Sequence, residues 1–439
     1  MDNAIGVYDK TKNEDKIVLI TYGKIRIRPK NLIYIVLILT LLMGTLNDDF
    51  GVTTNIRYLN DVATLLLMFS LFFDKKIQKY IPYLGLNKII IAMLVYTLVN
   101  IISIIINMVS VSLVVWAVRN TYRFFVFFWA CIVYLEKEDL DRIFEIMYKI
   151  QWANVVLIFY QFTVLNLKQD DLGGIFGHGG NAGLLIYSVL LLAYAVSKYV
   201  SKEYSMFKVL FVLISTCVIS VLAEIRAFFV FALIIVIVNA ILNKSIIRKT
   251  GVILVSIILF FVAVDLYSKL FPYVSLTLDA FIKEGSSTGG GYNISRFNAL
   301  SEINRLFFKN DNLRELFGFG FGNCEYSNIP LFRSKFYDLY GSYNYRWFTS
   351  QWVFLETGYA GVVSYIGIVL FNLSYSIKIL KLKKDDDKVF KLICIILSIV
   401  CIISFFYNSL LKADFGYIAF FSLAISGIVY KEEKLESEK

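Results

Sequence analysis

The sequence contains few charged residues, a single histidine and five cysteines. Charged residues make up 18% of the 439-residue chain, whereas a soluble domain carries about a quarter. One histidine cannot build a zinc site, and no two cysteines have the spacing of metal ligands. Cys324 is the only cysteine in the one long polar interval, so we expect no disulfide within that interval. We therefore expect neither a metal nor another cofactor.

Apolar residues dominate the chain and occur in runs. They make up 58% of the sequence. A membrane-spanning helix needs about 20 residues, so the shorter runs must extend into flanking residues or tilt. The pattern predicts an all-α integral membrane protein with about 12 transmembrane helices. The predicted segments lie near residues 31–46, 59–73, 88–109, 112–134, 147–166, 182–198, 208–223, 227–242, 251–267, 352–377, 391–408 and 416–430.

Basic residues alternate between the connections of these segments. The N-terminal tail and every second connection are rich in Lys and Arg, while the short connections between them carry only Arg57, Lys168, Arg226 and Lys412. This bias follows the positive-inside rule and predicts two cytoplasmic termini. It also explains the net charge of +10 without a nucleic-acid partner. The first 30 residues are polar and basic, so they are not typical of a cleavable signal peptide.

The topology predicts five parts of the chain. They are a cytoplasmic tail (1–30), helices 1–9 (31–267), an extracytoplasmic loop between helices 9 and 10 (268–350), helices 10–12 (351–430) and a second tail (431–439). The long loop is the only long polar interval, and we expect it to be the catalytic or binding part.

Three patterns within the long loop predict local structure. An apolar residue at every third position from Ile294 to Leu306 predicts an amphipathic helix over about 293–309. The glycine-rich stretch 285–291 predicts a hinge before it. Gly318, Gly320 and Gly322 lack the spacing and context of a dinucleotide site, so they predict a tight backbone loop.

Five arginines are candidates for phosphate binding, because a guanidinium binds phosphate through two parallel hydrogen bonds and stays charged. Arg296 and Arg305 lie in the long loop, and Arg226 lies in the tight outer turn with Glu224. Each also has a structural interpretation: Arg305 could pair with Glu302, and Arg226 could extend to the membrane interface.

Arg119 and Arg123 lie inside the fourth apolar segment and on one face of the expected helix. Charges at this depth are costly unless they face the bundle interior or a wet cavity, so they are functional candidates by default. The alternative is that the segment boundary is misplaced by several residues.

Several further side chains could take part in proton transfer or sugar binding. His178, in the glycine-rich stretch 173–181, could be a base or a turn residue. Asp61, Asp265 and Glu356 lie at or near outer ends of spans, where each could be a base or a surface charge. Tyr340, Tyr343 and Tyr345 could stack on sugars or belong to an interfacial aromatic belt.

Three pieces of the sequence, in this order, resemble the O-antigen and capsular polysaccharide polymerase family (Wzy-type), which shares its architecture with the O-antigen ligases. The first is the glycine-rich stretch 174–181 leading into a span, and the second is the outer turn 223–227. The third combines Arg296, the turn 316–320 and the Glu-x-Gly-x-x-Gly sequence at 356–361. The resemblance covers about residues 170–370.

This resemblance implies a GT-C-like glycosyltransferase in the bacterial cytoplasmic membrane. Such an enzyme moves a growing glycan from undecaprenyl pyrophosphate to the non-reducing end of a lipid-linked repeat unit on the outer face, without a metal, in capsule or lipopolysaccharide synthesis. Arg226 and Arg296 would bind pyrophosphate, with Arg305 behind them. The implied partners are the undecaprenyl-pyrophosphate-linked oligosaccharide, membrane lipids, a chain-length regulator and a flippase.

One departure from the family pattern separates the two activities. The ligases carry a histidine shortly before the Glu-x-Gly-x-x-Gly sequence, whereas residues 347–352 contain none. This difference favours a polymerase and leaves the base open among His178, Glu224 and Glu356. An O-antigen ligase and a lipid-linked oligosaccharide flippase or other transporter are the alternatives. A long outer loop is unexpected in a flippase.

Overall fold

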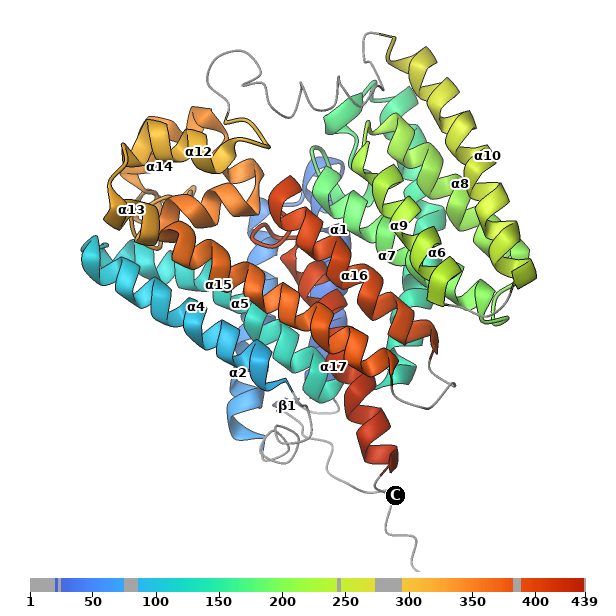
Figure 1. The fold of residues 1–439 in the computed structure, drawn as a ribbon, viewed down its shortest axis with the longest axis horizontal. Coiled ribbons are helices and arrows are strands. Elements are labelled where there is room, and N and C mark those ends of the chain that lie inside the picture. The colour runs from blue at the N-terminus through green and yellow to red at the C-terminus, as the bar shows by residue number, and fades with distance from the viewer. Residues whose placement is uncertain are drawn as a thin grey trace, which may run out of the picture.

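The computed structural model of the protein describes residues 20–22, 25–74, 86–242, 246–272, 294–381 and 388–437. Within them the regular structure is helical (Figure 1) except for β1 (Ile20–Tyr22) and β2 (Ile25–Ile27), which pair antiparallel. Nine described helices are long and apolar enough to cross a membrane, and α8 and α9 are shorter. The prediction of a helical, multi-pass membrane protein is therefore supported, while the count of twelve crossings stays a prediction.

Each of the twelve predicted apolar segments falls on a helix of its own. The first nine helices are α1 (Pro29–Asp48), α2 (Tyr58–Phe73), α4 (Asn87–Ile106), α5 (Val111–Tyr134), α6 (Lys137–Thr163), α7 (Asn181–Val200), α8 (Met206–Leu222), α9 (Ala227–Leu242) and α10 (Ile246–Leu270). The last three are α15 (Thr349–Leu380), α16 (Lys388–Tyr407) and α17 (Gly416–Ser437). The long loop contributes α12 (Ala299–Ile303), a π-helix η5 (Asn304–Phe308), α13 (Asn312–Phe317) and α14 (Lys335–Tyr340).

Short 3-10 turns lie in connections of the first half of the chain and in the long loop. They are η1 (Thr54–Arg57), η3 (Gln169–Asp171) and η4 (Gly174–Phe176) in the first half of the chain, followed by η6 (Pro330–Phe332), η7 (Gly341–Tyr343) and η8 (Tyr345–Trp347) in the long loop.

The break between α8 and α9 was expected from the charges at Glu224 and Arg226. Glu224 has a φ of 54°, a left-handed conformation that ends α8 and reverses the chain. The backbone amide of Ile225 donates to the carbonyl of Ser220 at 2.8 Å, which closes the turn. The structure therefore confirms two helices with a tight turn rather than one long helix.

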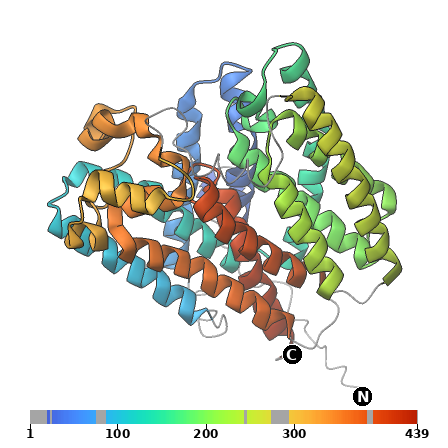
Figure 2. The same ribbon diagram turned by 45° about the horizontal axis from the view of Figure 1, so that its top comes forward.

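The long helices form two groups joined by a central layer. In Figure 1, α6 to α10 lie on one side, α4, α5 and α15 lie on the other, and α16 and α17 lie between them. Helix α15 packs against α4 and α16, and α17 packs against α5. Helix α7 is almost wholly buried, whereas α10 is the most exposed of the spanning candidates and lies at the outer edge in both views (Figures 1 and 2).

The short helices of the long loop gather over one end of α4, α5 and α15, away from the end of α17 (Figure 2). The predicted helix over 293–309 is wrong in its first turn, because residues 294–298 are not helical and α12 begins at Ala299. The Ser295 amide and hydroxyl donate to the Glu302 carboxylate at 2.8 and 2.9 Å, which folds this stretch back over the helix start. The predicted glycine hinge at 285–291 lies outside the described residues.

The three loop glycines pack on a break in α15. Gly358 has φ 62° and ψ −161°, so it interrupts the helix and leaves carbonyls without helical partners. The amides of Phe319 and Gly320 donate to the carbonyls of Leu355 and Glu356 at 2.8 and 3.0 Å. A Cβ on Gly318 would lie 2.5 Å from the backbone of Glu356. This close approach confirms the predicted tight backbone loop.

Candidate functional site

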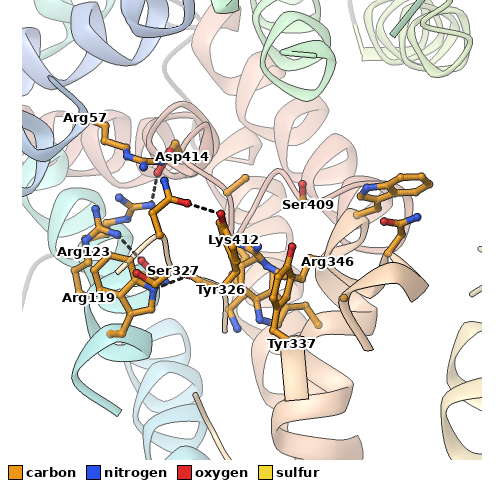
Figure 3. Close-up of a pocket in the computed structure, with 18 of the residues that line it drawn as sticks. Arg57, Arg119, Arg123, Tyr326, Ser327, Tyr337, Arg346, Ser409, Lys412 and Asp414 are labelled. Atoms are coloured by element: carbon orange, nitrogen blue, oxygen red, sulfur yellow. Dashed lines mark hydrogen bonds and ion pairs between the residues drawn. The ribbon is translucent and has the colours of Figure 1, made fainter. Parts of the chain in front are cut away.

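A cavity of about 340 Å³ lies at the end of the bundle that bears the long loop and is lined by five cationic side chains. We call it the cationic cavity (Figure 3). Its cations come from four chain segments: η1, α5, η8 and the connection between α16 and α17. Asp414 is the one carboxylate that lines it among the described residues. The cations are Arg57, Arg119, Arg123, Arg346 and Lys412.

Helix α5 supplies the two arginines that were predicted from their depth in an apolar segment. Both lie well inside the helix, which begins at Val111. Where the membrane boundary falls along α5 stays a prediction. Arg119 donates through Nε to Asp61 of α2 at 3.0 Å, and a guanidinium nitrogen of Arg123 lies 3.3 Å from the same carboxylate. They face the bundle interior, as the cost of burying charge requires.

Asp414 holds Arg123 from the opposite side. Its carboxylate lies 2.6 Å from the Arg123 guanidinium. Burial by itself raises the pKa of Asp414, but the positive charges of Arg123, Arg119 and Arg57 outweigh it and lower the pKa below its ordinary value. Asp414 is therefore an ionised counter-charge and a poor proton acceptor.

Arg346 lies among aromatic rings with no ion pair to any described carboxylate. Its guanidinium carbon is 4.3 Å from the ring centre of Trp352, 5.3 Å from that of Tyr326 and 5.6 Å from that of Tyr337. Its Nε is buried and has no hydrogen-bond partner among the described residues. Cation–π contacts hold the group in place but leave its hydrogen-bond donors for a ligand.

Lys412 is fixed from behind the cavity wall. Its ammonium forms an ion pair with Glu356, lies 3.4 Å from Glu325 and lies 4.2 Å from the centre of the Trp352 ring. Both carboxylates are fully buried, and neither lines the cavity. Glu356, a predicted candidate base, is therefore paired inside the protein rather than exposed to a substrate.

A second cavity, of about 430 Å³, contains the arginines that the resemblance singled out. We call it the Arg226 cavity. Arg226 donates through Nε to the Tyr267 hydroxyl at 2.9 Å and pairs with Glu224. Arg296 lies with its guanidinium carbon 4.9 Å from the Tyr407 ring centre. Asp170, Asp171 and Glu224 supply the carboxylates of the lining.

The two cavities are neighbours, because Trp347 and Ser409 line both. The connection between α16 and α17 provides Ser409 to both walls, and Asn408 accepts the Thr349 amide and hydroxyl at 2.9 and 3.0 Å. This hydrogen bonding ties the start of α15 to the end of α16. A ligand in one cavity is therefore within reach of a ligand in the other.

Other predicted residues lie elsewhere. Arg305 is exposed on the π-helix and lines neither cavity. His178 is exposed beside the Arg226 cavity, and its Nε2 lies 3.2 Å from Asp49. Tyr345 is fully buried, with its hydroxyl donating to the Cys324 carbonyl, so its ring is closed to a sugar. Tyr340 and Tyr343 pack on Phe307.

Sequence reasoning did not select Arg57, Arg346, Lys412 or Asp414 as site residues. Two of them could have been selected from the sequence. Arg57 and Lys412 are each the single basic residue in a connection that is predicted to be outside. Arg346 stands in an aromatic run, which is the composition of a cation–π cluster. Asp414 had no such signal, since its role depends on α5 packing against the α16–α17 connection.

The donor set suits an anionic ligand with a flat, hydroxylated part. Arginine forks match phosphate oxygens, and aromatic faces match sugar rings. Within the described residues, no group of three or more His, Cys, Asp or Glu side chains could hold a metal ion. Comparison with protein-family models and with curated proteins finds no match.

Proposed function

We propose that the protein is a membrane glycosyltransferase that polymerises lipid-linked oligosaccharides and uses a lipid pyrophosphate as the leaving group. The observation that carries this proposal is the convergence of five cations on one aromatic-walled cavity, two of which, Arg57 and Arg346, have no ion pair with a described carboxylate. Glycosyl transfer from a lipid pyrophosphate develops negative charge on the leaving oxygens. Preorganised arginines stabilise such charge without reorganising during the reaction.

The neighbouring Arg226 cavity provides a place for the acceptor. Arg226 and Arg296 would hold the pyrophosphate of the second lipid-linked repeat unit, and Trp347, common to both cavities, would contact the sugars between them. The acceptor hydroxyl must lose a proton, and the Glu224, Asp170 and Asp171 carboxylates line this cavity. The resemblance of residues 170–370 to the Wzy-type polymerases supports the same reaction.

The proposal is tested by incubating purified protein with lipid-linked repeat units and no other enzyme. We expect a ladder of polymer lengths, formed equally well in the presence of a metal chelator. Arg296→Ala should fold but give no polymer, because no described carboxylate neutralises this guanidinium. Arg314→Ala is the matched control, since Arg314 lies in the same loop, pairs with Asp311 and lines neither cavity.

Deleting the gene separates the alternatives. Loss of a polymerase leaves single repeat units at the cell surface, loss of a ligase removes surface attachment, and loss of a flippase retains the units inside the cell. Wild-type chain lengths from Arg296→Ala at normal protein level would reject the proposed site.

A further inference from the structure

An apolar groove of about 650 Å³ runs between α7, α8, α9 and α10. Its walls are aliphatic and aromatic side chains, with Cys217 and Ser256 as the exceptions. Residues of α9 and α10 at its rim, among them Leu233 and Ile257, are exposed on the outside of the helix group. On α9 the lining extends from Phe228 to Ala240, which is about 18 Å along the helix. This length fits within a hydrocarbon layer about 30 Å thick.

Helix α7 connects this groove with the Arg226 cavity. Ala182 and Leu185 line the cavity, and Leu192 and Val196 line the groove. Leu192 follows Leu185 by seven residues, which places it two turns and about 10 Å further along the same face. One face of α7 therefore extends from the Arg226 cavity to the apolar groove.

A second connection between the Arg226 cavity and the groove lies at the start of α9. Arg226 lines the cavity, and Phe228 and Phe229 begin the groove directly after it. Phe229 and Cys217 line the groove and also pack against the small buried cluster that contains Tyr267. The Tyr267 hydroxyl accepts from Arg226. The side chain that accepts from the guanidinium thus belongs to a cluster that packs against residues of the groove.

A cation site above an apolar groove fits an amphipathic ligand with an anionic head. We propose that the groove holds the polyprenyl chain of a lipid pyrophosphate whose head binds at Arg226 and Arg296. This inference rests on the proposed function for the class of lipid. The surrounding bilayer is as apolar as the groove, so the contacts that favour the chain are packing contacts rather than transfer from water. The groove is therefore specific for chain shape and length.

The experiment compares binding of undecaprenyl pyrophosphate and of the ten-carbon geranyl pyrophosphate to the protein in phospholipid nanodiscs. Ile257→Trp and Leu233→Trp each fill the groove from a different helix. Ile258→Trp is the matched control, because Ile258 is the next residue on α10, is also exposed and does not line the groove. Arg226→Ala tests the head site.

We expect Ile257→Trp and Leu233→Trp to weaken undecaprenyl pyrophosphate binding about tenfold, or about 1.4 kcal/mol, and to leave geranyl pyrophosphate binding unchanged. Ile258→Trp should match the wild type for both ligands, and Arg226→Ala should weaken both. Equal affinities of Ile257→Trp and Ile258→Trp for the long chain would overturn the proposal. That outcome is also expected if the groove is filled by bilayer phospholipid.

The readout separates this inference from the proposed reaction. A wild-type protein that shows the chain-length dependence but forms no polymer would reject the polymerase and keep the groove. A protein that polymerises normally with Ile257→Trp and binds the long chain normally would reject the groove and keep the polymerase.

Discussion

At Arg346, three aromatic rings surround a guanidinium that has no ion pair with a described carboxylate. Because the described part of the chain gives its buried Nε no hydrogen-bond partner, a ligand oxygen would complete the hydrogen bonding of the guanidinium. We expect Arg346→Ala to lower the polymerisation rate about 10²-fold or more, as loss of one preorganised donor does. Arg346→Lys should recover part of the rate, since it keeps the charge and loses the planar fork.

The rate is measured on purified variants with lipid-linked repeat units, alongside their thermal unfolding. Arg314→Ala, outside both cavities, should react as the wild type does. Activity of Arg346→Ala within a factor of about two of the wild type, which is well below the effect of losing one donor, would remove Arg346 from the site.

Asp414 gives a prediction for pH. Its pKa is lower in the folded protein because Arg123 and its neighbours outweigh the effect of burial. A lowered carboxyl pKa stabilises the fold above the unfolded pKa of about 3.9, and this stabilisation is lost as pH falls through the folded value. We expect Asp414→Asn to unfold at a lower temperature than the wild type at pH 7, and the difference to shrink below pH 4.

Thermal unfolding at both pH values checks this expectation. Asp265→Asn is the control, because Asp265 forms an exposed ion pair with Lys269, and such pairs contribute little. A difference for Asp414→Asn that is as large at pH 3 as at pH 7 would contradict the assignment of Asp414 as an ionised counter-charge.

The sequence predicted a functional residue where a charged side chain stands in a segment that should be apolar. Arg119 and Arg123 were found because two charges in an apolar segment require a reason. Arg226 and Arg296 were selected from a turn and from a resemblance, and they do line one cavity. Lys412 could not be paired with Glu356 from sequence, because the two are brought together only when α15 packs against α16 and α17.

At the scale of the element, the break in α15 depends on Gly358. Its φ is 62°, and a Cβ there would lie 2.4 Å from the backbone of Leu316. We expect Gly358→Ala to destabilise the protein by roughly 2–5 kcal/mol, from left-handed strain and overlap. Gly367→Ala, in the same helix with no atom within 4 Å, should be neutral or stabilise by up to about 1 kcal/mol.

Thermal unfolding of the two variants measures this contrast. Because the break carries the carbonyls of Leu355 and Glu356 that accept from the long loop, Gly358→Ala should also lower polymer formation. Equal unfolding temperatures for Gly358→Ala and Gly367→Ala would mean that the kink is not required.

Elements were predicted well where hydrophobicity defines them. All twelve apolar segments became helices, because long apolar runs must satisfy their backbone internally. The helix at 293–309 failed in its first turn, because a period of three residues does not report the hydrogen bonds from Ser295 to Glu302. The π-helix η5 and the kink at Gly358 likewise depend on tertiary contacts that a local pattern does not contain.

At the scale of the whole molecule, charge bias predicts that the long loop is outside and the start of α6 is inside. Among the described residues between Glu138 and Leu339, five helices of the α6–α10 group connect the two positions. An odd number of crossings puts them on opposite faces. The side chains of Glu138 and Leu339 are both largely exposed. Four of the five native cysteines are buried, and Cys217 is half-buried. Labelling of an introduced cysteine can therefore be detected above the wild-type background.

We expect a membrane-impermeant maleimide to label Leu339→Cys in intact cells and Glu138→Cys only after permeabilisation. The two helices shorter than a full span, α8 and α9, are what this pair tests. If α8 and α9 both cross the membrane, or if neither does, the number of crossings between Glu138 and Leu339 stays odd. If one of the two helices crosses alone, that number is even. Labelling of both positions in intact cells would therefore mean that α8 and α9 do not act as a pair, and the Arg226 turn would lose its place beside the long loop.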